Sequence, residues 1–338
     1  MARTVAAPAQ PPGTAQRLFT LTRPFPPPAS VLLLSPLCAA TSFAPQGGPM
    51  RALAPWLLWL AVLAGSPAIA AEIGVATLVE GQVRLLRGTT WHKTVPGTGL
   101  EDGDILAVGE KSLVQLEVEP ASAVSLTGPG AVHIEPPPAK SRPGAPAATV
   151  FNVQDGWLKV AATAPGVRVR TAPADVAIID GVMVMRAKGP ALELFMESGS
   201  ARLTETAAAG ADATPRDLRS GEYWSKLPGA AFAMAARPPK AFVDAMPRHY
   251  VDALPRLRDR FKTRPTLVPE GEITYAEAEP WLTGRDRVAF ERRFVSRLRD
   301  PAFRNAVAPH ASRYPSWDRR LNPHKYAPPP APRAAAPR

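Results

Sequence analysis

Cysteine is almost absent from this sequence, with Cys38 the one example in 338 residues. A single thiol cannot form a disulfide within the chain, and a cysteine-based metal site is excluded. The five histidines offer no alternative, because no two of them have the spacing of metal ligands. We therefore expect no metal and no cofactor, and a fold that depends on its packed core.

The short motifs of the common enzyme classes are also missing. The sequence has no G-x-S-x-G nucleophile elbow, no Walker A loop and no zinc-protease helix. Gly97, Gly99 and Gly103 miss the dinucleotide fingerprint by one residue and lack its strand–turn–helix context. No nucleophile, base and orienting group can be assembled. We expect a protein that is not an enzyme, with no catalytic residue and no small-molecule substrate.

Acidic residues are absent from the first 70 residues, which carry four Arg. The net charge of +11 is unevenly spread over the rest of the chain: residues 71–236 carry −3 and residues 237–338 carry +10. A nearly neutral middle and a basic C-terminal region indicate two units with different partners. Opposite signs also permit the second unit to dock on the first.

One short apolar run predicts export. Met50-Arg51 is a positive start, Leu53–Leu63 is an apolar stretch, and Ala68–Ala70 is a small-residue cleavage site. Residues 50–70 therefore resemble a cleavable signal peptide, which implies a periplasmic protein. A membrane anchor is the alternative, although the run is short and interrupted by proline. Residues 1–49 are rich in Pro and Ala, and we expect a non-native or disordered leader from an incorrectly chosen start codon, or an unusually long leader.

Alternation of apolar and polar residues predicts short strands between residues 73 and 227. Gly-rich turns separate them, which favours a β-sandwich or a rolled β-sheet. Residues 136–148 form a Pro-rich insertion, and residues 207–216 resemble a loop.

The apolar period becomes helical in the basic region, residues 238–326. Residues 241–246, 248–254 and 255–262 are predicted to be short helices. Thr274 and Glu277 form a capping box, and Asp300-Pro301 begins another helix. The sequence thus predicts a mainly β protein with a small all-α C-terminal region, followed by a disordered Pro/Ala tail at residues 327–338.

Trp281, Tyr314 and Trp317 lie among Arg residues in this region. Basic and aromatic residues together occur in nucleic-acid binding, but export argues against that partner. A helical unit this small needs its few large side chains to close a core. We therefore expect these rings in the core, with Arg stems packed on them, and no nucleic acid as a partner.

The β region resembles the FecR family, the periplasmic part of bacterial iron-citrate sensor proteins. The similarity rests on Val75–Leu85, on Gly99 to Leu116, and on a second half from Val169 to Arg202. The resemblance implies a FecR-like β domain over residues 73–227. The sequence departs from the pattern of the sensor members. They carry an anti-sigma helix region and a membrane-spanning helix before the domain, whereas here we expect only a cleavable signal there, so the resemblance does not imply transmembrane signalling.

A protein-interaction or scaffold module of the cell envelope is the expected function. The alternative is a binder of an anionic envelope polymer such as peptidoglycan or lipopolysaccharide.

The Gly99 to Gly109 segment carries the most specific part of this resemblance. We expect Gly99, Gly103, Asp104 and Gly109 to be structural turn residues. Gly103 would supply a positive φ, and Asp104 would bond nearby backbone. Glu101, Asp102 and Asp104 suggest calcium as an alternative, but the remaining spaced ligands of a calcium loop are missing.

A basic face is expected on the predicted helix Arg285–Arg299. Phe290, Phe294, Val295 and Leu298 form an apolar stripe. Four arginines fall mainly away from that stripe and are expected to face solvent: Arg285, Arg292, Arg293 and Arg299. Arginine suits bidentate contact with carboxylate or phosphate. We expect this face to meet an anionic partner, namely an acidic envelope protein, a lipid surface or a cell-wall polymer. A merely solvated face is the alternative.

Overall fold

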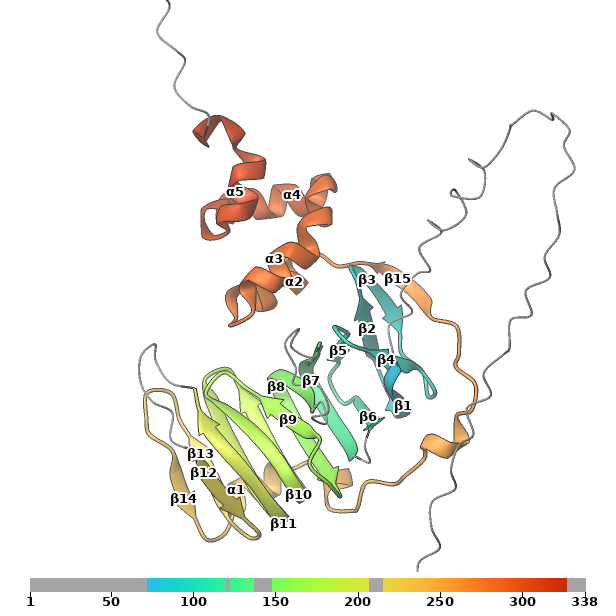
Figure 1. Ribbon diagram of the computed structural model, residues 1–338, viewed down its shortest axis with the longest axis vertical. Helices are drawn as coiled ribbons and strands as arrows, with labels where there is room; N and C mark the ends of the chain where they lie inside the picture. Colours follow the sequence, from blue (N-terminus) through green and yellow to red (C-terminus); the bar gives the residue numbers. More distant parts are fainter. Residues whose placement is uncertain (1–71, 120–121, 137–147, 207–214, 327–338) are drawn as a thin grey trace, which may run out of the picture. The chain divides into compact units, whose positions relative to one another are not determined.

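The computed structural model describes residues 72–119, 122–136, 148–206 and 215–326 (Figure 1). The predicted leader, signal peptide and C-terminal tail lie outside the described residues, as does most of the Pro-rich insertion. Among the described residues, no helix is long and apolar enough to cross a membrane.

The prediction of a mainly β chain with a small helical C-terminal region is confirmed. The strands of the β region are β1 (Glu72–Glu80), β2 (Val83–Arg87), β3 (Thr90–Lys93), β4 (Gly99–Glu101), β5 (Ile105–Val108), β6 (Leu113–Val118), β7 (Ser122–Glu135), β8 (Thr149–Ala162), β9 (Val167–Arg170), β10 (Ala174–Lys188), β11 (Ala191–Glu205), β12 (Arg216–Arg219), β13 (Tyr223–Lys226) and β14 (Ala233–Ala235). They join one sheet in which described neighbours pair antiparallel, except for the parallel pair β8–β9.

Strand β7 makes the sheet roll. Its first half pairs with β6 and its second half pairs with β5, so the sheet divides there and curves round one interior. Alternate side chains of β8, β10 and β11, such as Leu158, Met183 and Leu194, are fully buried in that interior. The alternation of the sequence therefore selects the inner face of each strand.

A pair of glycines bends the long strands β10 and β11. Gly181 and Gly199 lie opposite each other with φ of +96° and +77°. A Cβ on Gly181 would lie 2.0 Å from the Ser198 carbonyl oxygen, and one on Gly199 would lie 2.3 Å from the Asp180 oxygen. Only glycine permits this close approach of two backbones. The short strands predicted on either side of these glycines are consequently halves of two long, bent strands.

The C-terminal region contains short helices and one further strand. These elements are α1 (Lys240–Ala245), the 3-10 turns η1 (Arg248–Tyr250) and η2 (Arg258–Arg260), β15 (Val268–Glu272), α2 (Tyr275–Thr283), α3 (Arg287–Phe294), η3 (Val295–Arg299), α4 (Pro301–Val307), η4 (Ala308–Arg313), α5 (Pro315–Leu321) and η5 (Pro323–Tyr326). The capping box of Thr274 and the N-cap of Asp300 are both present, as predicted.

One local prediction was wrong, and two strands were not predicted. The helices predicted over 248–254 and 255–262 are reduced to η1 and η2, and the residues between them form neither helix nor strand. Strand β12 begins at Arg216, the last residue of the predicted loop. Val268–Glu272 pairs with β3, although its Pro and Gly are unfavourable in strands. For both strands a pairing partner distant in sequence overrides the local preference.

The C-terminal helices pack on the β region through one apolar cluster. Leu86, Trp91 and Ile105 of β2, β3 and β5 share this cluster with α2 and α3. Trp281, Tyr314 and Trp317 are buried in it, which confirms the predicted core role of these rings. The β region and the C-terminal region therefore belong to one compact unit.

Candidate functional site

The turn before β5 is closed by its own backbone. Gly103 has a φ of +86°, and its N–H donates to the Ile134 carbonyl at 2.8 Å. The Asp104 N–H donates to the Glu101 carbonyl at 3.2 Å. In return, Asp104 Oδ2 accepts from the Glu101 N–H at 2.8 Å. Gly103 and Asp104 thus lie in a tight turn with reciprocal hydrogen bonds.

Arg87 of β2 occupies the acidic side of this turn. Its Nε donates to Asp104 Oδ1 at 3.0 Å and its Nη2 to Asp104 Oδ2 at 2.6 Å. The same guanidinium donates to Glu101 Oε1 at 2.7 Å and to the Gly99 carbonyl at 3.0 Å. Both oxygens of the buried Asp104 already have donors, so the guanidinium charge stands where a calcium ion would have to bind.

The remaining two turn glycines lie against neighbouring chain. A Cβ on Gly99 would lie 2.6 Å from Glu72 Oε2, and one on Gly109 would lie 3.2 Å from the Gln82 carbonyl. Neither glycine has a positive φ. A side chain at Gly99 would have to displace the Glu72 carboxylate, and one at Gly109 would press lightly on the backbone of Gln82, whereas backbone conformation limits the residue at Gly103.

The four arginines of the predicted basic face do not form one surface. Arg293 points into the molecule, where its guanidinium donates to the carbonyls of Leu86 and Gly88 at 3.1 and 2.8 Å and also to that of Gly103. Burial lowers the pKa of Arg293 to about 10, although Asp104 acts in the opposite direction. The expectation that Arg293 faces solvent was wrong, because its side chain reaches from α3 to these carbonyls of the β region and donates to all three.

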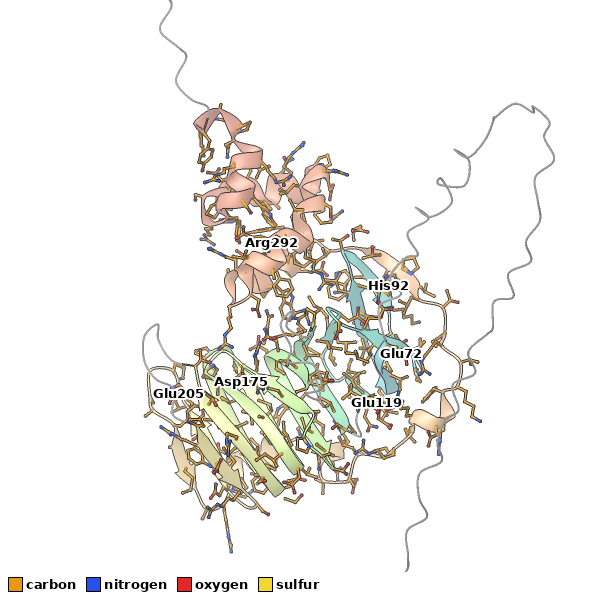
Figure 2. The ribbon with its side chains drawn as sticks, viewed as in Figure 1. Glu72, His92, Glu119, Asp175, Glu205 and Arg292 are labelled. Carbon is orange, nitrogen blue, oxygen red and sulfur yellow. The ribbon has the colours of Figure 1, made fainter. Side chains whose placement is uncertain are left out.

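Arg292 and Arg299, here called the outer arginines, remain exposed. Figure 2 labels Arg292 on the helical region. They make no hydrogen bond or ion pair with any described residue. Val288 precedes Arg292 by one helical turn and is 53% exposed. The outer arginines are therefore the part of the predicted face that is free to meet a partner.

Other basic residues of the C-terminal region are paired with the β region. Arg264 makes a bidentate pair with Glu72 at 2.6 and 2.8 Å, and this hydrogen-bonded contact lowers the pKa of the Glu72 carboxyl. Arg258 pairs with Glu119. In the opposite sense, Arg84 of β2 reaches Glu277 of α2 at 2.8 Å. Each exposed pair contributes little to stability, but together they orient the basic segment on the acidic surface.

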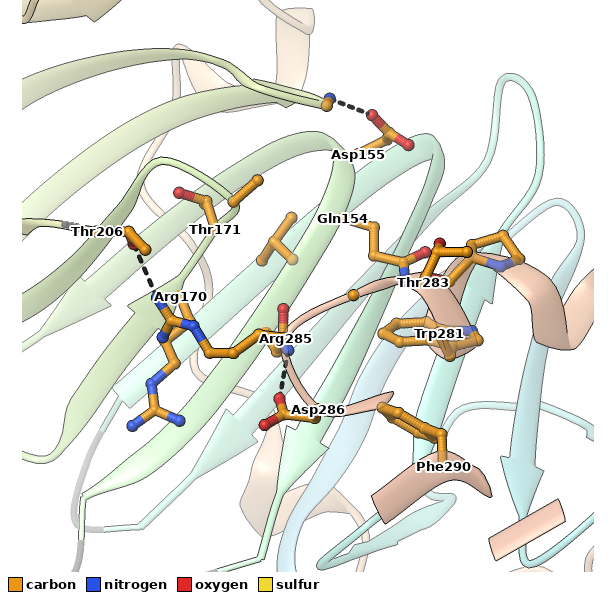
Figure 3. A pocket seen from close by; sticks show the side chains of 16 residues that line it. Gln154, Asp155, Arg170, Thr171, Thr206, Trp281, Thr283, Arg285, Asp286 and Phe290 are labelled. Atoms are coloured by element: carbon orange, nitrogen blue, oxygen red, sulfur yellow. Dashed lines mark hydrogen bonds between the residues drawn. The ribbon is translucent and has the colours of Figure 1, made fainter. Parts of the chain in front are cut away.

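Arg285 belongs to a different place, a cavity of about 540 Å³ between the sheet and the helices (Figure 3). Asn152, Gln154 and Asp155 of β8 line the sheet side, together with Arg170, Thr171 and Thr206. The helix side comprises Pro280, Trp281, Thr283 to Asp286, and Phe290. Arg285 Nη2 donates to Thr206 Oγ1 at 2.8 Å across the cavity.

Polar groups of the cavity are held in place by a few bonds. Asn152 Nδ2 donates to Asp286 Oδ2 at 3.2 Å, and Asp155 Oδ1 accepts from the Gly189 N–H at 2.8 Å. Arg170 pairs with Glu135 and, at 3.2 Å, with Asp175. Burial raises the pKa of Glu135, and Arg170 opposes this shift. Among the described residues, nothing bonds to the side-chain amide of Gln154.

Sequence reasoning did not find this cavity. Asn152 and Gln154 occupy the polar positions of the alternation in β8, so the local pattern does not distinguish them from other outward-facing residues. Nothing in the local sequence connects Asn152, Gln154 and Asp155 with Arg285, which lies 130 or more positions away.

The comparisons with known proteins are sparse. No family model and no curated protein matches the chain. A crystal structure at 2.50 Å of a candidate anti-sigma factor from Parabacteroides distasonis ATCC 8503 has a TM-score of 0.33 and 13% identity, covering 42% of this chain and 64% of that one. A second, at 1.65 Å, has a TM-score of 0.31 and 13% identity, with coverages of 39% and 59%. The matched region spans less than two thirds of the length of each of these solved chains.

Proposed function

We propose that this protein is a non-enzymatic, FecR-like interaction module of the bacterial cell envelope, and that the outer arginines bind an acidic surface of a partner protein. The observation that carries the proposal is the state of Arg292 and Arg299. Both are exposed and unpaired among the described residues, while the neighbouring Arg293 anchors α3, the helix of Arg292, to the β region. A rigid support presents charged groups with a small loss of entropy on binding.

A protein partner is favoured over a polymer by the apolar residue beside the charge. Val288 is half exposed one turn before Arg292. Protein interfaces combine apolar contact with arginine, which can pair with carboxylates in a bidentate manner. An anionic polymer would use the charges alone.

The test is site-specific crosslinking. A photoreactive residue at Val288 is expected to capture one recurrent protein, and capture should fall at least about tenfold in Arg292→Glu/Arg299→Glu. Arg260→Glu is the matched control, since Arg260 is equally exposed and lies on η2. A photoreactive residue at the exposed Val251 controls for random capture.

Two outcomes would contradict the proposal. Equal capture by the wild type and the double variant would leave the outer arginines as a solvated surface. Co-sedimentation with peptidoglycan or lipopolysaccharide that depends on the same arginines, without protein capture, would identify a polymer binder.

The envelope location is part of the proposal and rests on the residues from Met50 to Ala70. The protein isolated from the periplasmic fraction is expected to begin at Ala71 or Glu72. Intact chain beginning at Met1 in the cytoplasm would contradict export, and would leave the crosslinking test to be judged separately.

A further inference from the structure

We infer that the cavity between the sheet and the helices is a binding site for a neutral saccharide of one or two pyranose units. The inference does not depend on the outer arginines, because none of the cavity-lining residues belongs to that pair. It assigns a ligand to a part of the molecule that the proposed function leaves unused.

The cavity has the size of a small-molecule site. Its volume of about 540 Å³ lies within the range of about 300–1,000 Å³ that is usual for such sites. It is formed where β8, β9 and β11 meet the segment joining α2 and α3. Figure 3 shows Arg170 and Thr206 on one side, with Trp281, Thr283 and Phe290 on the other.

The wall of the cavity carries both hydrogen-bond donors and hydrogen-bond acceptors that are not yet used. The Gln154 amide offers both kinds, and Arg285 uses one nitrogen on Thr206 and keeps the others. Asp155 and Asp286 each receive a single described hydrogen bond and can accept more. Hydroxyl groups both donate and accept, so a sugar can bond to such a mixed set of half-buried and exposed groups.

The charge of the wall disfavours an anionic ligand. Arg170 is already paired with Glu135 and Asp175, which leaves one arginine, Arg285, against two carboxylates, Asp155 and Asp286. An additional negative charge would add to this excess of carboxylate. The hydroxyl groups of an uncharged sugar can donate to the two carboxylates and accept from Arg285.

An apolar strip completes the site. Ala172 and Pro280, which are both exposed, form it, together with the small exposed parts of the largely buried Trp281 and Phe290 rings. The C–H face of a pyranose ring can pack on such a strip while its hydroxyls meet the polar wall. The combination distinguishes a saccharide from a phosphorylated or strongly acidic ligand.

The experiment uses the full mature chain and saturation-transfer NMR, supported by titration calorimetry. The probes are cellobiose and N,N′-diacetylchitobiose, with digalacturonic acid and an acidic tripeptide as charged comparators. At least one neutral disaccharide is expected to bind through its ring protons. Gln154→Ala and Asp286→Ala should each weaken it by about tenfold, and Arg292→Ala should leave it unchanged.

Binding of neither neutral disaccharide at about 10 mM would overturn the inference, as would exclusive binding of a charged comparator. Unchanged affinity in both cavity variants would show that the sugar binds elsewhere. Thermal unfolding of each variant checks that the fold is retained, and Gln154→Glu supplies a second variant that keeps the side-chain size. A result here is distinguishable from the crosslinking test, which concerns Arg292 and Arg299.

Discussion

The β region and the C-terminal region are stabilised in different ways. The β region encloses a core to which nearly every strand contributes alternate side chains. The C-terminal helices are short, and they share their apolar cluster with the β region. Their aromatic cluster is completed by Leu86, Trp91 and Ile105 from the β region. The helices thus depend on the sheet, whereas the core of the sheet contains no residue of α2 to α5.

The polar contacts show the same asymmetry. In the segment before β15, which has little regular structure, several backbone groups bond to side chains of the sheet. Gln115 donates to the Pro255 carbonyl at 2.7 Å, and Glu117 accepts from the Leu257 N–H at 2.6 Å. The buried Lys159 donates to the Tyr250 carbonyl. A segment without helix or strand can persist only because a folded surface supplies these partners.

The largest effect is therefore expected from separating the two regions. A fragment of residues 72–236 should keep its β-sheet circular dichroism and unfold cooperatively. A fragment of residues 237–326 should lack cooperative unfolding, since its cluster loses three apolar partners and the segment before β15 loses its hydrogen-bond partners. The matched reference is the chain 72–326. Cooperative unfolding of the isolated C-terminal fragment would contradict the asymmetry.

Local sequence patterns predicted the elements that local physics controls. The alternation around Val167–Arg170 and the capping box at Thr274 both match observed elements. The pattern failed at β15 and between η1 and η2, where Pro and Gly argue for other conformations. There the structure depends on partners more than 90 positions away, and no window of sequence contains them.

The basic face was predicted in part for a similar reason. The apolar stripe of Phe290, Phe294 and Leu298 is buried, and Arg292 lies opposite to it as expected. Arg293 lies at the boundary of the stripe, where a helical projection does not decide its direction. Its direction is set by carbonyls of the β2–β3 turn and of Gly103. Helical position predicts exposure only where nothing else packs on the helix.

The adjacent arginines Arg292 and Arg293 give the second test of the comparison. Arg293→Ala removes three hydrogen bonds to carbonyls of the β region, and the free energy of unfolding is expected to fall by about 2 kcal/mol or more. Arg292→Ala removes no described contact and should change it by less than about 0.5 kcal/mol. Urea unfolding of both variants measures the difference. Equal values would show that Arg293 does not anchor the helices.

A third test uses pH, because a histidine lies between the two regions. The ring of His133 in β7 packs edge-on against Trp281 and Phe290, with ring centroids 6.0 and 4.9 Å apart, and its Nδ1 has no hydrogen-bond partner among the described residues. Burial lowers the pKa of His133 to about 3, and the nearby Arg293 acts in the same direction. The folded protein therefore keeps this ring neutral at pH values where the unfolded chain protonates it.

The direction in which stability changes with pH follows from the protons that the unfolded chain takes up. Stability due to the neutral ring is complete above about pH 6.5 and is lost as the pH falls toward 3. Between pH 7.5 and 5 the wild type should lose up to about 2 kcal/mol more than His133→Gln, which has no such titration. Urea midpoints at the two pH values test this. Parallel pH dependence in both proteins would place the acid sensitivity elsewhere.

The smallest expected effect concerns the turn at Gly103, whose carbonyl accepts a hydrogen bond from Arg293 of α3. Gly103 has a φ of +86°, and a Cβ there would meet no atom within 4 Å. Gly103→Ala should therefore cost only the backbone strain, about 1 kcal/mol, and Gly103→Asn should cost less because asparagine tolerates this conformation. Calcium should restore neither variant, since Asp104 is already bonded to Arg87. Thermal unfolding with and without calcium measures both points.

A calcium-dependent rise in the midpoint of the wild type would instead assign Glu101, Asp102 and Asp104 to a metal. Alanine and asparagine variants of equal stability would show that the positive φ is not what limits this position, and would leave the carbonyl contact to Arg293 as the feature that fixes the turn.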